Sequence, residues 1–235
     1  MTKEIILKTI QPIATDGISQ KVIEDLQADG FLFQESHGSI LMNLFIVGST
    51  EGFAQLPSAI NSVQKKAFKN VVLFTSPALD TKDIDGVNAF INFGDTKDIH
   101  EAIKLFLCHF SETIEIPSLI GYDFHSFMQI IEGHNSIETK TCGYTHDISE
   151  ALKTLRATPI PQGSKCVLFF TQQETNAPHT LEVVNEHLES IPDTIAFNFS
   201  FNTSTHLYVS LLISKPIKKK GKGCIFEKLI RFFKK

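Results

Sequence analysis

The chain has 235 residues, 42% of them hydrophobic, and a formal net charge of −4 at pH 7. That length allows one large domain or two small ones, able to bury a core without disulfide support. No apolar run reaches the roughly 20 residues of a membrane-spanning helix, so we expect no crossing of a membrane. Four scattered cysteines without a CxxC pair, and a start without a secretory signal, predict a reducing cytoplasmic environment.

The charge is divided unevenly along the chain. Residues 215–235 contain nine Lys or Arg and one acid, Glu227, whereas residues 1–214 contain 13 bases and 25 acids. The body therefore has a net charge of −12 and the tail a net charge of +8. An acidic body binds phosphates poorly, so we expect no nucleic-acid binding by the folded part.

The first half alternates strands with helices. Apolar runs predict buried strands at residues 4–10, 41–48 and 71–76, and amphipathic periodicity predicts helices at 19–30, 56–70 and 95–112. Pro57 falls in the first turn of the second helix, and the long third helix has an Asp or Thr cap. Such alternation predicts a parallel sheet covered by helices on both faces.

The second half has a different order of elements. The pattern predicts strands at residues 137–145 and 165–171, helices at 146–157 and 179–191, and a final hairpin at 194–214. In the first arm of that hairpin, Ile195, Phe197 and Phe199 alternate with small or polar residues, which indicates one buried face. We therefore expect a compact α+β unit after a boundary near residues 112–120.

The segment SLIGYDFHSFMQII, residues 118–131, joins the two halves. Apolar residues at Phe124, Phe127 and Ile131 have helical spacing, and Asp123 directly precedes them. An acid at that position either caps the helix or belongs to an active site.

The turn STEGFAQLP after the second strand is a candidate phosphate site. A phosphate-binding turn needs glycines, so that backbone N–H groups can approach the anion at a helix N-terminus. This turn keeps Gly48 and Gly52, places Glu51 where an anion would lie, and adds the bulky Phe53 and Leu56. We therefore interpret it as an ordinary strand-to-helix loop and expect no nucleotide cofactor.

Metal ligands are present but scattered. The candidates are Cys142, His146, His125 and His134. Zinc needs three or four ligands at linked spacings, so we expect no metal site. Cys108 and Cys166 lie inside apolar elements and are predicted to be core residues.

In the order and spacing of its elements, the chain resembles the FtsZ and tubulin superfamily, whose members bind GTP between subunits and polymerise. LMNLFIVGS resembles the strand before the family's glycine signature, DTKDIHEAIKLFLCHF its central helix, and SLIGYDFHSFMQII the loop after that helix. The fold this implies is α/β: a reduced parallel-sheet half joined by a long central helix to an α+β half. The implied parts are a degenerate nucleotide-binding-like domain (1–97), a linking helix (98–117), an FtsZ-type domain (118–214) and a tail (215–235).

The departures from the family pattern imply a loss of GTPase activity. In the family, an asparagine and a final aspartate of the loop help to position the attacking water, and this chain has Gly121 and Ser126 there. Serine cannot replace a carboxylate that orients water. The resemblance thus implies a pseudo-GTPase without catalytic residues or cofactor, in which Gly121, Tyr122, Asp123 and Phe124 contact a neighbouring subunit.

The tail is basic and amphipathic. On a helical wheel, the apolar side chains of IFEKLIRFFKK fill one arc and the charged side chains the other. Such a helix after a polybasic linker is typical of an anchor on anionic lipid, and a protein groove or a plain solvated end are the alternatives. Cys224 beside it is a candidate for acylation. The predicted membrane-binding residues are Lys218, Lys219, Lys220, Lys222, Ile225, Phe226, Lys228, Leu229, Ile230, Arg231, Phe232, Phe233, Lys234 and Lys235.

These observations favour a non-enzymatic FtsZ-like scaffold that self-associates or binds an FtsZ-type filament. Its expected place is the inner face of the cell membrane, on an anionic lipid surface. One alternative is a nucleotide-binding switch or enzyme on the same scaffold, which a nucleotide-binding assay would reveal. The other is an adaptor whose tail docks on a protein, which sedimentation with vesicles would reveal.

Overall fold

The structure is a computed structural model that describes residues 4–34, 40–63, 67–76, 83–94, 96–115, 118–120, 123–144, 148–172, 182, 195–201 and 207–217. The helices in this part are α1 (Gly17–Ala28), α2 (Thr50–Ser62), α3 (Ile99–Ile114), α4 (Phe124–Ile131) and α5 (Ile148–Arg156). Its strands are β1 (Ile5–Leu7), β2 (Ile10–Ala14), β3 (Phe31–Phe33), β4 (Met42–Val47), β5 (Lys69–Phe74), β6 (Ala89–Asn92), β7 (Ser118–Ile120), β8 (Gly133–Tyr144), β9 (Lys165–Gln172), β10 (Ile195–Phe201) and β11 (Leu207–Pro216).

Nine of these strands form one sheet, in the order β2-β4-β5-β6-β8-β11-β9-β10-β7. The strands β2, β4, β5 and β6 are parallel, and β6 is also parallel to β8, with Ala89 opposite Gly133. β11 lies antiparallel between β8 and β9, and β10 is parallel to β9. The long strand β8 therefore pairs with strands of both halves. β1 and β3 form a separate parallel pair.

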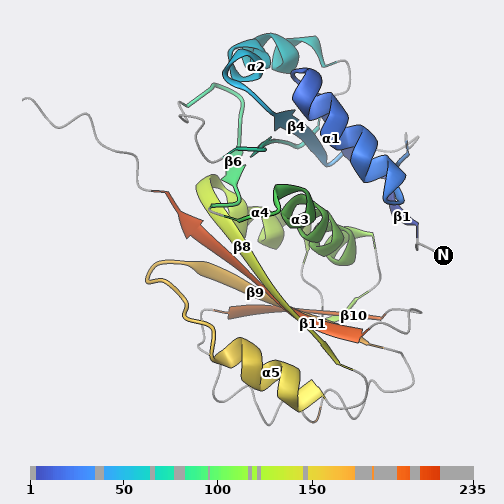
Figure 1. The fold of residues 1–235 in the computed structure, drawn as a ribbon, viewed down its shortest axis with the longest axis vertical. Coiled ribbons are helices and arrows are strands. Elements are labelled where there is room, and N and C mark those ends of the chain that lie inside the picture. Colours follow the sequence, from blue (N-terminus) through green and yellow to red (C-terminus); the bar gives the residue numbers. More distant parts are fainter. Residues whose placement is uncertain are drawn as a thin grey trace, which may run out of the picture.

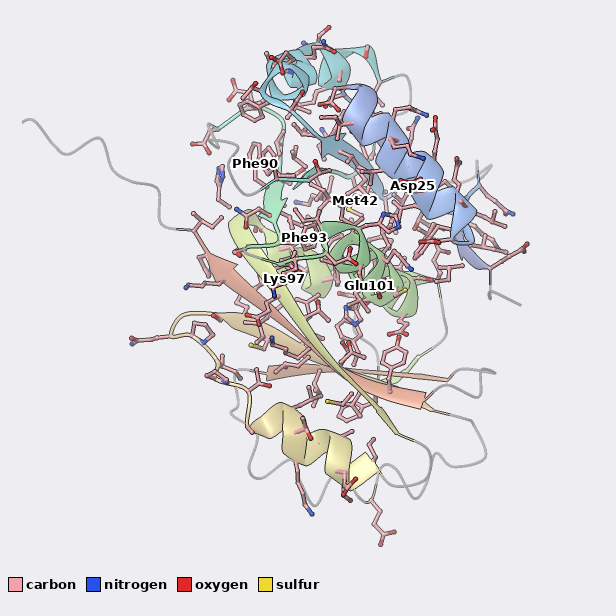
Figure 2. All side chains as sticks on the ribbon, viewed as in Figure 1. Asp25, Met42, Phe90, Phe93, Lys97 and Glu101 are labelled. Atoms are coloured by element: carbon pink, nitrogen blue, oxygen red, sulfur yellow. The ribbon has the colours of Figure 1, made fainter. Side chains whose placement is uncertain are left out.

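Helices cover both faces of the sheet (Figure 1). α3 and α4 lie between the N-terminal and the C-terminal strands, and with α1 they enclose the largest core, which includes Met42 and Phe93 (Figure 2). α2 packs over a second core that includes Phe90. α5 covers the outer side of β8, β9 and β11, above Cys166. Cys108 packs against the largest core, so the prediction that both cysteines are core residues is confirmed.

The strand β4 shows why its sequence is apolar throughout. Successive side chains alternate between the faces of a strand. Met42 and Leu44 accordingly enter the core of α1 and α3, whereas Phe45 and Val47 enter the core of α2. All residues of β4 are buried, as expected for a parallel strand with helices on both sides. The predicted parallel sheet covered on both faces is thus confirmed.

The structure corrects the predicted start of the second helix. α2 begins at Thr50, so residues expected to form a strand-to-helix loop belong to its first turns. Pro57 lies in its interior rather than in its first turn. The reason is a local cap: the Ser49 hydroxyl accepts the backbone N–H of Gly52 at 3.1 Å, which starts the helix six residues before the expected position.

The predicted hairpin at residues 194–214 is wrong. β10 and β11 both form, but β9 lies between them, parallel to β10 and antiparallel to β11. A hydrophobic pattern indicates that strands form and leaves open which strands pair. The structure also adds β6, a strand absent from the sequence-based prediction, and starts β8 at Gly133.

Some predictions concern residues outside the ranges that the structure describes. The expected helix at 179–191 lies outside the described residues, apart from Glu182, and so do Gly121, Tyr122, His146 and the tail from Lys218 onward. Within the described ranges, no helix is long and apolar enough to span a membrane.

Candidate functional site

The first candidate site lies where β2 and β4 end. These strands are parallel neighbours, with Ala14 opposite Ile46, so their carboxyl ends lie side by side. α1 begins just after β2, and α2 begins just after β4. Both helix N-termini therefore lie at this edge of the sheet. Anions bind at such places in α/β proteins, because backbone N–H groups and helix dipoles converge there.

One carboxylate, that of Asp16, lies between these two N-termini. Its Oδ1 accepts the backbone N–H of Ser19 at 2.7 Å and thereby caps α1. Its Oδ2 accepts the backbone N–H of Gly48 at 3.0 Å and the hydroxyl of Ser49 at 2.8 Å. Because Ser49 is the N-cap of α2, Asp16 links the starts of both helices.

Gly48 and Gly52 allow the Asp16 side chain to approach this closely. A Cβ atom at Gly48 would lie 2.7 Å from Asp16 Oδ1, and a Cβ atom at Gly52 would collide with Asp16 Oδ2. Glycine is the residue that permits such close approach. The glycines that suggested a phosphate turn therefore accommodate a side chain of the same chain.

Asp16 is ionised in this environment. Partial burial opposes its ionisation, but hydrogen bonds from Ser19, Ser49 and Gly48 outweigh burial and hold the pKa of Asp16 below its usual value. A negative charge therefore occupies the point where the donors converge. A phosphate would have to displace this carboxylate or bind beside it against charge repulsion.

The structure thus assigns to Asp16 the anion position that the sequence suggested for Glu51. Glu51 is exposed in the first turn of α2, where its carboxylate accepts the hydroxyl of Thr50 at 3.2 Å. Phe53 and Leu56 belong to the core under α2 and do not obstruct the turn. Asp16 was not among the site residues predicted from the sequence, although an acid between a strand and an amphipathic helix is an N-cap signal.

The second candidate site, at Asp123, is a helix cap. α4 begins at Phe124, and Asp123 Oδ1 accepts the backbone N–H of Ser126 at 2.7 Å. The capping alternative is thus confirmed, and hydrogen bonds from Ser126 lower the pKa of Asp123. Phe124 packs against the largest core, whereas Asp123 is exposed. The predicted contact of this segment with a neighbouring subunit stays a prediction.

Three of the four metal-ligand candidates, Cys142, His125 and His134, lie in the described part of the chain. Among the described residues, no group of three His, Cys, Asp or Glu side chains is placed to hold a metal ion. Cys142 is partly buried under α5, and His125 is exposed on α4. His134 stacks on Phe90 with ring centroids 4.4 Å apart, and its Nε2 lies 2.8 Å from Asp83 Oδ1.

Solved structures share this arrangement of elements. CetZ from Methanosaeta thermophila strain DSM 6194 matches with a TM-score of 0.52 at 13% identity, over 92% of this chain and 71% of that chain. CetZ1 from Haloferax volcanii and TubZ from Bacillus thuringiensis serovar israelensis give TM-scores of 0.46 and 0.43, each at 10% identity over 92% of this chain and 74% of the other. No family model matches the chain, and no curated protein matches its sequence.

CetZ belongs to the tubulin/FtsZ superfamily, so the match at a TM-score of 0.52 gives this chain a divergent fold of the tubulin/FtsZ type. The resemblance seen in the order of elements is thereby confirmed at the level of the fold. Fold and site together define an α/β protein with a tubulin/FtsZ-type fold that holds its own carboxylate at the ends of β2 and β4.

Proposed function

We propose that the chain is a non-enzymatic FtsZ-like scaffold. It self-associates head to tail, or adds to an FtsZ-type filament, without a bound nucleotide. Residues 215–235 attach the assembly to the cytoplasmic face of the cell membrane. β11 ends at Pro216 and Lys215 is exposed, so this basic segment begins at the surface of the described body, which supports a role in surface attachment.

The observation that carries the proposal is the position of Asp16 within a fold of this type. Backbone and hydroxyl donors at the ends of β2 and β4 are already hydrogen-bonded to an ionised side chain. A nucleotide phosphate bound there would take these donors from Asp16 and place two negative charges together. Ser126, which lies where the family has a water-orienting acid, supports the same conclusion.

Head-to-tail association would join two unlike ends of the molecule, and different elements lie at these two ends. Asp16 lies at the carboxyl ends of β2 and β4. α3 ends at the other end of these strands, because Glu115 accepts backbone N–H groups from just before β2 at 3.0 Å. α4, which starts after Asp123, ends beside the start of β6, where the N–H of Gly133 donates to the carbonyl of Asn88 at 2.9 Å. Contact between two unlike ends of this kind builds open filaments.

The nucleotide part is tested with the purified full chain. We expect no saturable binding of GTP at micromolar concentration and no release of phosphate. Ser126→Asp should not restore turnover, because the Asp16 carboxylate still occupies the donor site. Saturable micromolar binding of GTP to the wild type would overturn the proposal.

The association part is tested by sedimentation with and without GTP. The pelleted fraction should not depend on nucleotide. Ile18, in the first turn of α1 and 55% exposed, lies next to Gly48 at the Asp16 end, so Ile18→Glu should reduce pelleting by about tenfold. The matched control is Ile160→Glu, at a 36% exposed side chain after α5, which should pellet normally. A wild type that stays monomeric at high concentration, with and without vesicles, would contradict self-association.

A further inference from the structure

Asp16 differs from the other helix-capping acids of the described chain. Asp98 caps α3 and Asp123 caps α4, and each accepts the backbone N–H three residues further on in its own helix. Asp16 does the same for α1. Its second oxygen also accepts two hydrogen bonds from the start of α2, 32 and 33 residues away. A cap that served α1 alone would not need this second set of donors.

Contacts that do not involve the Asp16 carboxylate also hold the end of β2 and the start of α1. Ser19 is fully buried, and its hydroxyl accepts the backbone N–H groups of Thr15 and Asp16 at 3.0 and 2.9 Å. The Thr15 hydroxyl donates to the carbonyl of Ile46 at 3.1 Å and so ties the end of β2 to β4. Fixed N–H and O–H donors beside two glycines, here Gly48 and Gly52, are features of an oxyanion site.

We propose that this is an oxyanion site whose resident ligand is the Asp16 carboxylate. The carboxylate holds the starts of α1 and α2 together as a bound phosphate or sulfate would. Because the carboxylate takes the place of an external anion, this end of the molecule needs no bound ligand to hold its conformation. This statement rests on the proposed scaffold function, in which no nucleotide is bound. Removal of the carboxylate should open the site to small inorganic oxyanions.

The experiment measures thermal unfolding of the full chain in sodium chloride, sulfate and phosphate at matched ionic strength. Asp16→Ala should lower the Tm by about 5 °C, because two helix starts lose a charged acceptor. Phosphate and sulfate should raise the Tm of Asp16→Ala by about 3 °C more than they raise that of the wild type, with saturation in the millimolar range. This comparison removes the general stabilisation that these salts give to any folded protein.

Three further variants make the test specific. Asp16→Asn keeps the space filled and should gain nothing extra from phosphate. Asp123→Ala removes a cap that serves one helix and should respond to phosphate as the wild type does. Asp16→Ser keeps an N-cap for α1 while vacating the position of the second oxygen, so it replaces Asp16→Ala if that variant does not fold.

A phosphate-selective gain confined to Asp16→Ala and Asp16→Ser supports the proposal. An equal gain in the wild type or in Asp123→Ala overturns it, and so does the absence of any selective gain. The nucleotide assay is independent of this result. GTP binding by the wild type would overturn the proposed scaffold function. Failure of phosphate to stabilise Asp16→Ala selectively would overturn only the proposal that the Asp16 carboxylate occupies an oxyanion site.

Discussion

His109 shows how a polar side chain can serve as an apolar ring in this core. It is fully buried on α3, and neither ring nitrogen has a hydrogen-bond partner among the residues that the structure describes. Its ring stacks on that of Phe169 in β9, with centroids 4.2 Å apart and 17° between the planes. Burial lowers the pKa of His109 to about 3, so the ring is neutral at physiological pH. Each unpaired buried nitrogen costs on the order of 1–3 kcal/mol.

The first prediction is that His109→Phe stabilises the protein and flattens its stability against pH. Between pH 6.5 and about 3 the unfolded state binds a proton at His109 that the folded state does not bind. Stability of the wild type should therefore fall as the pH is lowered through this window, by up to about 1.4 kcal/mol per pH unit. Phe keeps the stacking on Phe169, removes the unpaired nitrogens and cannot titrate.

Urea unfolding of both forms at pH 7 and pH 5 measures this difference. His125→Gln, at an exposed histidine of α4, is the control and should keep the acid sensitivity of the wild type. An identical loss of stability in wild type and His109→Phe on acidification would show that other groups govern the pH dependence.

At the scale of elements, α2 contains a local conflict. Ser49 caps its start, and Leu56 is fully buried on its inner face. Pro57 follows on the exposed side, well inside the helix. Proline has no N–H, so the carbonyl of Phe53 loses its partner one turn later, and the ring crowds the preceding turn. The helix forms because cap and core contacts outweigh this defect.

The second prediction is that Pro57→Ala stabilises the protein by about 1–3 kcal/mol. Alanine restores the missing backbone hydrogen bond and fits the exposed side of α2. It also raises the conformational entropy of the unfolded chain, which offsets part of this gain in stability. Denaturant unfolding measures the change. The control is Pro161→Ala in the loop before β9, where no helix is interrupted and stability should fall slightly or stay the same. A destabilised Pro57→Ala would mean that the proline shapes the start of α2.

Elements with complete local signals could be predicted from the sequence. β4 is apolar on both faces, and α3 combines helical periodicity with the Asp98 cap, which accepts the N–H of Glu101 at 2.9 Å. The insertion of β9 between β10 and β11 could not be predicted, because pairing depends on contacts between distant residues. For the same reason, the hydrogen bond between Asp16 and Gly48 could not be predicted, because the two residues come together only when β2 and β4 pair.

At the scale of the whole molecule, the two halves share one sheet and one core. β8 pairs with β6 and with β11, and the largest core includes Leu44 of β4 and Leu212 of β11. The sheet ends at Pro216 opposite Asn135, and the backbone N–H of Ile217 donates to the carbonyl of His134 at 2.8 Å. The shared sheet and the largest core are built from residues 5–216, so we expect the body to fold without the tail.

The third prediction concerns the tail and anionic lipid. A chain that ends at Ile217 should keep the Tm of the full chain and lose binding to vesicles that contain anionic lipid. The full chain should bind them and detach as salt is raised, because the tail carries a net charge of +8 and salt screens its attraction to the surface. Helical circular dichroism should increase on binding, since eleven residues from Ile225 onward are too few for a stable helix in water.

Two kinds of substitution separate insertion from charge. Phe226→Glu together with Ile230→Glu places acids in the apolar arc and should abolish vesicle binding, because apolar insertion supplies part of the affinity. Lys234→Ala keeps that arc and removes one charge, on the order of 1 kcal/mol, so binding should weaken and depend less steeply on salt. Vesicle co-sedimentation measures both. Binding of the truncated chain, or equal binding of the full chain to neutral and anionic vesicles, would contradict an electrostatic anchor and favour docking of the tail on a protein.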